Sequence, residues 1–184
     1  QAMKDADPLT QGKYRDAFEA DFSDYIGASY SFAVCNATAG LEMVAQLCEF
    51  KEDDEFIIPS HTYTSSAYPF VKKGATPIWA DIDLQTLVVT ADTIRPLITK
   101  RTKAIVVVHL YGQPAKMDEI SACLKDRKIF LIEDAAQGLG STYNNQMIGS
   151  FGDVSAFSFF GNKLMTTGEG GMVCFQNQAI FEQA

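Results

Sequence analysis

The sequence of 184 residues has few histidines, no cluster of positive charge and no long hydrophobic run. Its two histidines, His61 and His109, are too few for a histidine-rich metal cluster, so we expect no metal. The formal net charge is −8, and no group of Lys and Arg offers the basic surface that nucleic acid requires. The longest apolar run, residues 104–108, is far too short to span a bilayer, so we expect no membrane partner.

Residues 1–10 lack the positive and apolar regions of a signal peptide, which favours a cytoplasmic protein. The four cysteines, Cys35, Cys48, Cys123 and Cys174, form no C-x-x-C pair and match no zinc spacing. Each has apolar neighbours in the sequence. We therefore expect four buried free thiols in a reducing compartment.

Periodicity and turn signals predict an alternation of helices and strands. Hydrophobic residues make up 47% of the chain, enough for one domain with a real core. Helices are expected over residues 14–25, 41–50, 62–73, 92–98 and 116–125. Strands are expected over residues 31–35, 55–59, 76–80, 103–109 and 128–134 and at Val154 and Met172, with a small hairpin over 143–148. This order predicts an α/β fold whose sheet is mostly parallel, with flanking helices and right-handed crossovers.

Ligands of such sheets bind beyond the carboxyl ends of the strands, so the residues there are the informative ones. Residues 36–40 follow the first strand and open a helix, and the amides of a helix N-terminus bind anions such as phosphate. Thr38 adds a hydroxyl, and Ala39 is small enough for close approach. A plain N-cap turn is the alternative reading, and the segment is not a Walker loop.

Aromatic side chains follow two other strands. Tyr63 or His61 could lie flat over a planar ring, although an aromatic residue at a strand-to-helix junction is often part of the core. His109 ends the strand 103–109. It could contact a substrate or be a hydrogen-bonded structural histidine.

An acid and two polar side chains complete the set. Asp134 ends an apolar strand, where a carboxylate needs a partner or its pKa rises. That partner could be a capping amide or a protonated ring nitrogen. Gln137 follows in the same turn, and Ser158 ends a later strand with a hydroxyl that could bind phosphate.

Lys163 lies in the turn that follows the strand at Val154, beside the glycine-rich residues 166–171. It could be an ordinary surface lysine. A lysine held there, partly removed from water, could instead form a Schiff base. With the phosphate cradle, the aromatic ring and Asp134, it completes the parts that a pyridoxal phosphate (PLP) site requires.

Five segments, NATAG, PSHTYTSSA, VHLYGQP, IEDAAQGLGSTY and FSFFGNKLMTTGEGGMV, together resemble the DegT/StrS family of nucleotide-sugar aminotransferases. The resemblance covers about residues 8–181, with its perosamine-synthase-like branch as the nearest match. It implies PLP as cofactor and the aspartate-aminotransferase-like fold, called fold type I.

The resemblance also implies roles for individual residues. Lys163 would be the catalytic Schiff-base lysine. Asp134, the other catalytic residue, would pair with the pyridine nitrogen, and Gln137 would lie near the ring hydroxyl. Tyr63 would stack on the ring.

The phosphate would be held by Thr38, Ala39 and Ser158. Residues 167–171 would shape the turn beside the lysine. A neighbouring subunit of a homodimer would help to hold the phosphate, with a segment that lies beyond Ala184.

The implied reaction transfers an amino group, usually from glutamate, to a keto-deoxy sugar linked to a nucleotide, as in deoxyamino-sugar and polysaccharide biosynthesis. Family members are roughly twice as long as this chain. Residues 1–184 are therefore expected to be the PLP-binding large domain, incomplete at its C-terminus and without the small C-terminal domain.

Three alternatives remain open. A dehydratase relative acting on keto sugars would carry a histidine in place of Lys163. A non-catalytic, truncated homologue would keep the fold for a regulatory or structural role. A generic nucleotide-binding α/β domain is a third reading, which the absence of a Walker loop and of G-x-G-x-x-G weakens.

Overall fold

Seven strands of the computed structural model, which describes residues 11–184, form one sheet in the order β1-β9-β8-β5-β4-β2-β3. The strands are β1 (Tyr30–Val34), β2 (Glu55–Pro59), β3 (Thr76–Ala80), β4 (Thr102–Val108), β5 (Phe130–Asp134), β8 (Val154–Ser158) and β9 (Gly171–Phe175). From β8 to β3 every neighbouring pair is parallel, whereas β9 runs antiparallel to both β1 and β8. The prediction of a mostly parallel α/β sheet is confirmed.

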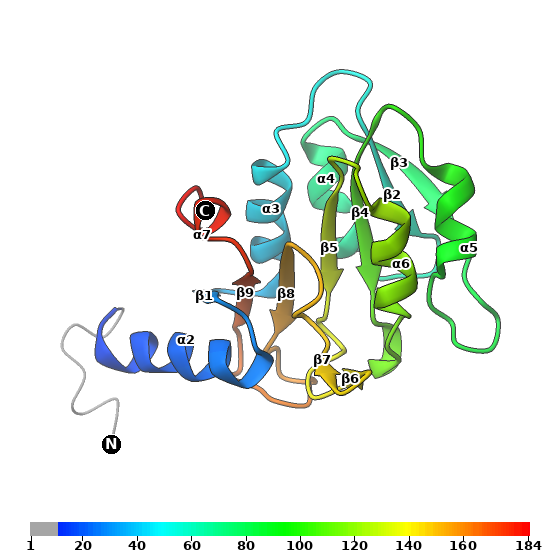
Figure 1. Ribbon diagram of the computed structural model, residues 1–184. Coiled ribbons are helices and arrows are strands. Elements are labelled where there is room, and N and C mark those ends of the chain that lie inside the picture. The colour runs from blue at the N-terminus through cyan, green and yellow to red at the C-terminus, as the bar shows by residue number, and fades with distance from the viewer. Residues whose placement is uncertain (1–10) are drawn as a thin grey trace.

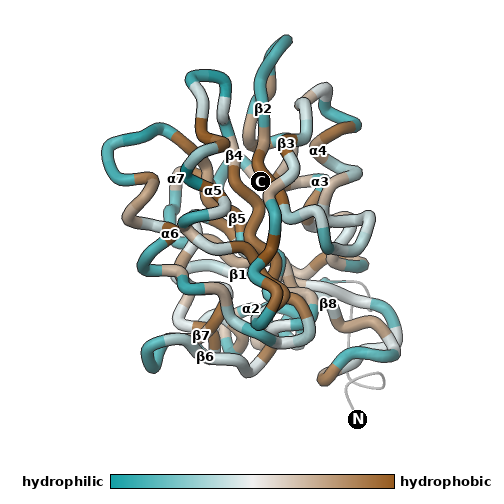
Figure 2. The backbone as a smooth tube through the Cα atoms, turned by 90° about the vertical axis from the view of Figure 1, so that its right-hand side faces the viewer, coloured by the Kyte–Doolittle hydropathy of each residue, from teal (hydrophilic) through white to brown (hydrophobic). Residues whose placement is uncertain are grey.

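Helices cover both faces of this sheet. They are α2 (Lys13–Ile26), α3 (Ala37–Leu47), α4 (Tyr68–Lys72), α5 (Ala91–Ile94), α6 (Met117–Leu124) and α7 (Gln178–Phe181), with 3-10 turns η1 (Thr64–Ser66), η2 (Arg95–Leu97) and η3 (Leu110–Gly112). Figure 1 shows α3 and α4 together behind the sheet and α5 and α6 together in front of it, and the side view in Figure 2 shows the same division.

The centre of the core is β4 and β5, whose middle parts are coloured as hydrophobic in Figure 2. The side chains of Ile105, Val106, Val107 and Ile132 are fully buried. Continuous burial of β-branched residues is expected for parallel strands with helices on both faces. The short hairpin of β6 (Thr142–Tyr143) and β7 (Gln146–Met147) is confirmed, with Asn144 and Asn145 in the left-handed conformation that such a turn needs.

Three predicted helices differ from the observed ones. The helix predicted over residues 62–73 is confirmed only in part: η1 comes first, and α4 begins at Tyr68 with Pro69 in its first turn, where proline is tolerated. The helix predicted over 41–50 begins earlier, because Asn36 caps it. The helix predicted over 92–98 ends at Ile94 and continues as the 3-10 turn η2 from Arg95, because Pro96 cannot donate an internal hydrogen bond.

The prediction of four buried thiols is wrong for two of them. Cys35 is exposed because it follows the edge strand β1, and Cys123 is half-buried near the end of α6. Cys48 and Cys174 are buried, and burial raises the pKa of each thiol to about 12. All four thiols are free.

The expectation about a signal peptide concerned residues 1–10, which lie outside the described residues. Among residues 11–184, no helix has the length and apolar character needed to cross a membrane. The same residues contain no group of three or more His, Cys, Asp or Glu side chains that could hold a metal ion.

Gly40 sets how closely α3 packs on β9, and this packing can be tested. A Cβ atom at position 40 would lie 2.6 Å from Cγ2 of Val173. We expect Gly40→Ala to lower the free energy of unfolding by roughly 1–3 kcal/mol through overpacking, measured by urea denaturation.

The matched control is the same substitution in a Val173→Ala background, where the obstructing methyl groups are absent. There the alanine should be neutral or stabilising, because alanine favours a helix over glycine by roughly 0.5–1 kcal/mol. An equal loss of stability in both backgrounds would show that the contact with Val173 is not the cause.

Candidate active site

A cavity of about 490 Å³ opens at the carboxyl ends of the parallel strands. Its polar lining comes from several strand ends and turns: Asn36, Thr38, Thr62, Tyr63, Ser65, Ser66, Asp134, Gln137, Ser158, Asn162, Lys163 and Glu169. Six of the seven residues predicted from the sequence therefore meet at one cavity. The exception is Ala39.

The N-terminus of α3 forms one wall. Asn36 caps the helix, with Oδ1 accepting the Ala39 N–H at 2.9 Å. The structure does not bring Ala39 to the cavity, because its amide is used by this cap. The amides of Ala37 and Thr38 have no partner within the described residues, and the Thr38 hydroxyl donates to Ser65 Oγ at 3.0 Å. An N-cap and a potential anion site thus occur in the same turn.

Gly171 allows the turn before α3 to pack closely against the sheet. A Cβ atom there would lie 2.8 Å from the nitrogen of Ala37 and from the carbonyl carbon of Asn36. Only glycine allows the start of β9 to approach the turn before α3 so closely. The glycine-rich segment after Lys163 therefore packs against the predicted phosphate cradle.

Asp134 is 5% exposed at the end of β5. The Ser66 hydroxyl donates to its Oδ2 at 2.7 Å and the Ala136 N–H to its Oδ1 at 3.1 Å, so the predicted capping amide is confirmed. Burial raises the pKa of the Asp134 carboxyl, although these hydrogen bonds and the positive charge of Lys163 oppose that rise. A positively charged ligand group beside this carboxylate would relieve the cost of burying its charge.

Lys163 lies in the turn after β8, half-buried at the cavity. Its backbone N–H donates to Phe160 O at 2.9 Å. The turn is closed by bonds from Phe159 N to Gly170 O at 2.8 Å and from Thr167 N to Phe159 O at 3.0 Å. The amine of Lys163 has no hydrogen-bond or ion-pair partner in the described part of the chain, so it is free to react with a ligand.

Tyr63 and Gln137 complete the lining. Tyr63 is 73% exposed, so the alternative that it belongs to the core is wrong. Gln137 is half-buried, and its Oε1 accepts the N–H of Tyr111 at 2.8 Å. Ser158 ends β8 at the same cavity, as predicted.

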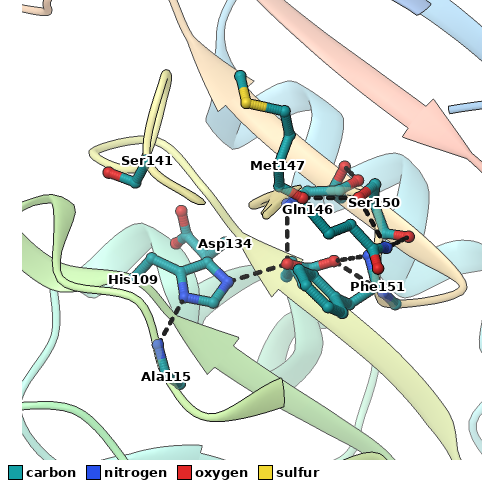
Figure 3. Close-up of polar contacts among 12 residues, drawn as sticks. His109, Ala115, Asp134, Ser141, Gln146, Met147, Ser150 and Phe151 are labelled. Carbon is teal, nitrogen blue, oxygen red and sulfur yellow. Dashed lines mark hydrogen bonds and ion pairs between the residues drawn. The ribbon is translucent and has the colours of Figure 1, made fainter. Parts of the chain in front are cut away.

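His109 is fully buried and cannot contact a substrate, so the structural alternative is confirmed. Its Nε2 lies 3.0 Å from Glu133 Oε2, and its Nδ1 accepts the Ala115 N–H at 3.2 Å. Figure 3 shows both contacts of the ring, with the Asp134 carboxylate pointing away from this cluster. His61 is exposed instead, with its ring centroid 6.2 Å from that of Tyr111.

Sequence reasoning missed several polar residues of the site. Ser66, which orients Asp134, and Ser65, which contacts Thr38, lie in the segment TYTSSA, but a serine pair carries no signal by itself. Glu133 could have been found, because a second acid in an apolar strand needs buried donors.

Comparison with solved structures identifies the class of protein to which this fold belongs. The X-ray structure of the aminotransferase from Psychrobacter cryohalolentis superposes on 95% of this chain with a TM-score of 0.91 at 36% identity, covering 45% of that chain. An E. coli GDP-4-keto-6-deoxy-D-mannose-3-dehydratase with bound hydrated PLP gives a TM-score of 0.93 at 29% identity, covering 99% of this chain and 48% of that chain. The chain has the fold of the fold type I PLP aminotransferases, as expected.

Sequence comparison narrows the class to a family. Residues 1–184 match the DegT/DnrJ/EryC1/StrS aminotransferase family, and the chain belongs to it. It is 41% identical to the GDP-perosamine synthase of Escherichia coli O157:H7 over 174 residues, which are 95% of this chain and 48% of that protein. The chain thus spans about half the length of the curated relatives that it matches.

The buried charge of Asp134 leads to a prediction about stability. Because its folded-state pKa is raised, the carboxylate destabilises the ligand-free protein increasingly as pH rises above its unfolded value of about 3.9. Asp134→Asn can still accept the Ala136 N–H and donate to Ser66. We expect the substitution to raise Tm near pH 7 by roughly 2–4 °C for each kcal/mol of destabilisation that it removes. Below pH 4 we expect no rise in Tm. Thermal denaturation at several pH values measures both.

Asp83 provides a control of opposite sign. Hydrogen bonds from the Thr86 backbone and hydroxyl lower the pKa of its carboxyl. Its contribution to stability is therefore present at neutral pH and is lost as pH falls through the lowered value. Asp83→Asn should lower Tm at neutral pH. An Asp134→Asn protein that is less stable than the parent at pH 7 would show that the buried charge of Asp134 does not destabilise the ligand-free protein.

Proposed function

We propose that this protein is a PLP-dependent sugar aminotransferase and that residues 1–184 form the cofactor-binding large domain of its architecture. The observation that carries the proposal is the pairing of two groups at one cavity. The amine of Lys163, which has no partner among residues 11–184, and the buried carboxylate of Asp134 both line it.

The residues present fit the cofactor. PLP supplies an aldehyde that condenses with amines and a ring that accepts electrons from the substrate carbon. When PLP is bound, Lys163 would be the residue that holds its aldehyde carbon and that could move a proton at the substrate carbon. Asp134 would hold a positive charge at the ring nitrogen, and that charge would offset the cost of burying the carboxylate.

The other residues bind and orient the cofactor. The hydroxyls of Thr38 and Ser158 and the first amides of α3 bind the phosphate, with Ala39 placing that turn. Tyr63 would cover one ring face, and Gln137 would lie near the ring hydroxyl. This assignment is supported by the cavity itself, because all of these residues except Ala39 line it.

The proposed substrates are an amino acid, glutamate, and a nucleotide-linked 4-keto-6-deoxy sugar that is aminated at C4. The 41% identity to a GDP-perosamine synthase supports this choice. The product would be a nucleotide-linked deoxyamino sugar for polysaccharide biosynthesis in the cytoplasm.

The proposed assembly is a homodimer whose site is shared between subunits. Aromatic side chains at and beside the cavity support it, since Tyr63 is 73%, Tyr111 70% and Phe160 46% exposed. A surface of this kind is suited to being covered by another polypeptide segment. A second subunit would also exclude water from the reacting groups.

Two other functions fit the fold less well. A keto-sugar dehydratase has a similar structure at 29% identity, but Lys163 stands where such relatives would carry histidine. A non-catalytic homologue with a regulatory or structural role would not need an unpartnered lysine beside a buried acid.

The lysine can be tested directly. Incubation of the purified protein with PLP, reduction with borohydride and peptide mapping should place a pyridoxyl group on Lys163. The adduct should disappear in Lys163→Ala, because no other amine lines the cavity among the described residues. Loss of the visible absorbance band should accompany loss of the adduct.

Lys128→Ala is the matched control, because Lys128 is exposed and does not line this cavity. It should label as the parent protein does. Equal labelling of both variants would remove Lys163 from the site. A labelled protein that transfers no amine from glutamate to a keto sugar would favour the non-catalytic alternative.

A further inference from the structure

Glu133 precedes Asp134 in β5, and strand alternation sends the two carboxylates to opposite faces of the sheet. The Glu133 side chain is fully buried. Its oxygens accept four hydrogen bonds, from His109 Nε2 at 3.0 Å, Gly149 N at 2.8 Å, Phe151 N at 2.7 Å and Gly152 N at 2.7 Å. The proposed function gives this fully satisfied carboxylate no role.

The hydrogen bonds of His109 define its tautomer. The Ala115 N–H points at Nδ1, so Nδ1 must be unprotonated and Nε2 carries the hydrogen that Glu133 accepts. The neutral imidazole ring therefore links two parts of the fold by hydrogen bonds. One is Glu133 in β5, and the other is Ala115, at the end of the turn between β4 and α6. Figure 3 shows His109 between these two contacts.

This turn contains a strained residue. Tyr111 has φ 56° and ψ 22°, a left-handed conformation that costs a bulky residue energy. It persists because both ends are held: Gly112 N donates to His109 O at 3.3 Å, and Ser141 Oγ donates to Gly112 O at 2.7 Å. Residues held in strained conformations cluster at active sites and ligand-binding segments.

The group that Tyr111 orients is Gln137. The Tyr111 N–H donates to Gln137 Oε1 at 2.8 Å, and a donor there requires the oxygen end of the carboxamide. The Nε2 end is therefore the one left for a ligand, and it has no partner in the described part of the chain. Gln137 also lines both the 490 Å³ cavity and an adjoining cavity of about 510 Å³, and these two cavities meet at Lys163.

We propose that Glu133 and His109 are positioning residues that anchor the strained turn, and that this turn makes Gln137 present an N–H donor to a negatively charged ligand oxygen. The inference rests on the proposed function only for the identity of that ligand, the ring hydroxyl oxygen of PLP. An N–H donor from Gln137 would stabilise this oxygen in its ionised form, whereas the carboxamide oxygen of Gln137 in the same place would repel it.

The first test needs no cofactor. His109→Gln can still reach Glu133 but leaves the Ala115 N–H without an acceptor, and His109→Asn can accept from Ala115 but loses Glu133. Each variant removes one of the two hydrogen bonds that anchor the turn. Each should therefore speed hydrogen exchange of the Tyr111 amide at least tenfold, measured by NMR. Gln113→Ala, an exposed residue of the same turn, should change it less than twofold. A folded His109 variant with unchanged Tyr111 exchange would overturn the anchoring role.

The second test uses a residue at the cavity, where misfolding is less of a concern. Gln137→Glu keeps an acceptor for the Tyr111 N–H but replaces the free donor by a carboxylate oxygen. We expect it to weaken PLP binding at least tenfold and more than Gln137→Ala does, in an equilibrium titration followed by absorbance. Binding as tight as in the parent protein would overturn the donor role. A parent protein that fails to bind PLP would count against the proposed function instead, and the exchange test would still decide the anchoring role.

Discussion

Two adjacent carboxylates on the central strand β5 are the constraint on which the rest of the site depends. The pleat sends them to opposite faces, and each is buried. Glu133 is satisfied by four donors of the protein itself, which link β5, the turn after β4 and the segment before β8. Asp134 receives two donors and faces the cavity, so its charge remains available to a ligand. One carboxylate therefore joins segments of the fold, and its neighbour faces the cavity.

The sheet makes this arrangement possible. Because β2, β4, β5 and β8 are parallel, their carboxyl ends lie at one edge, and the turns after them converge. The antiparallel strand β9 brings Gly171 against the start of α3. Groups from residues 36 to 169 thus meet although they are far apart in the chain. Their convergence has a cost in stability, since Asp134 is buried without a full counter-charge and Tyr111 is held in a strained conformation.

Much of the candidate site could be predicted from the sequence. Strand ends, turn residues and a lysine in a glycine-rich turn pointed to Thr38, Tyr63, Asp134, Gln137, Ser158 and Lys163, and all six line one cavity. The errors have local causes. Pro69 and Pro96 shortened helices that hydrophobic periodicity had extended. Ala39 is small and close to the cradle, but its amide donates to the capping side chain of Asn36, which only the three-dimensional arrangement reveals.

The sequence alone determined the alternation of strands and helices, the parallel sheet and the residues at its carboxyl edge, because these follow from local periodicity and from the geometry of parallel strands. Only the tertiary structure decided which polar side chains form hydrogen bonds with one another. Ser66 on Asp134, Tyr111 on Gln137 and His109 on Glu133 join segments from 24 to 68 residues apart. Hydrogen bonds at such separations leave no periodic trace in a sequence. They depend on how the chain packs, and they set the charge and orientation of each group at the site.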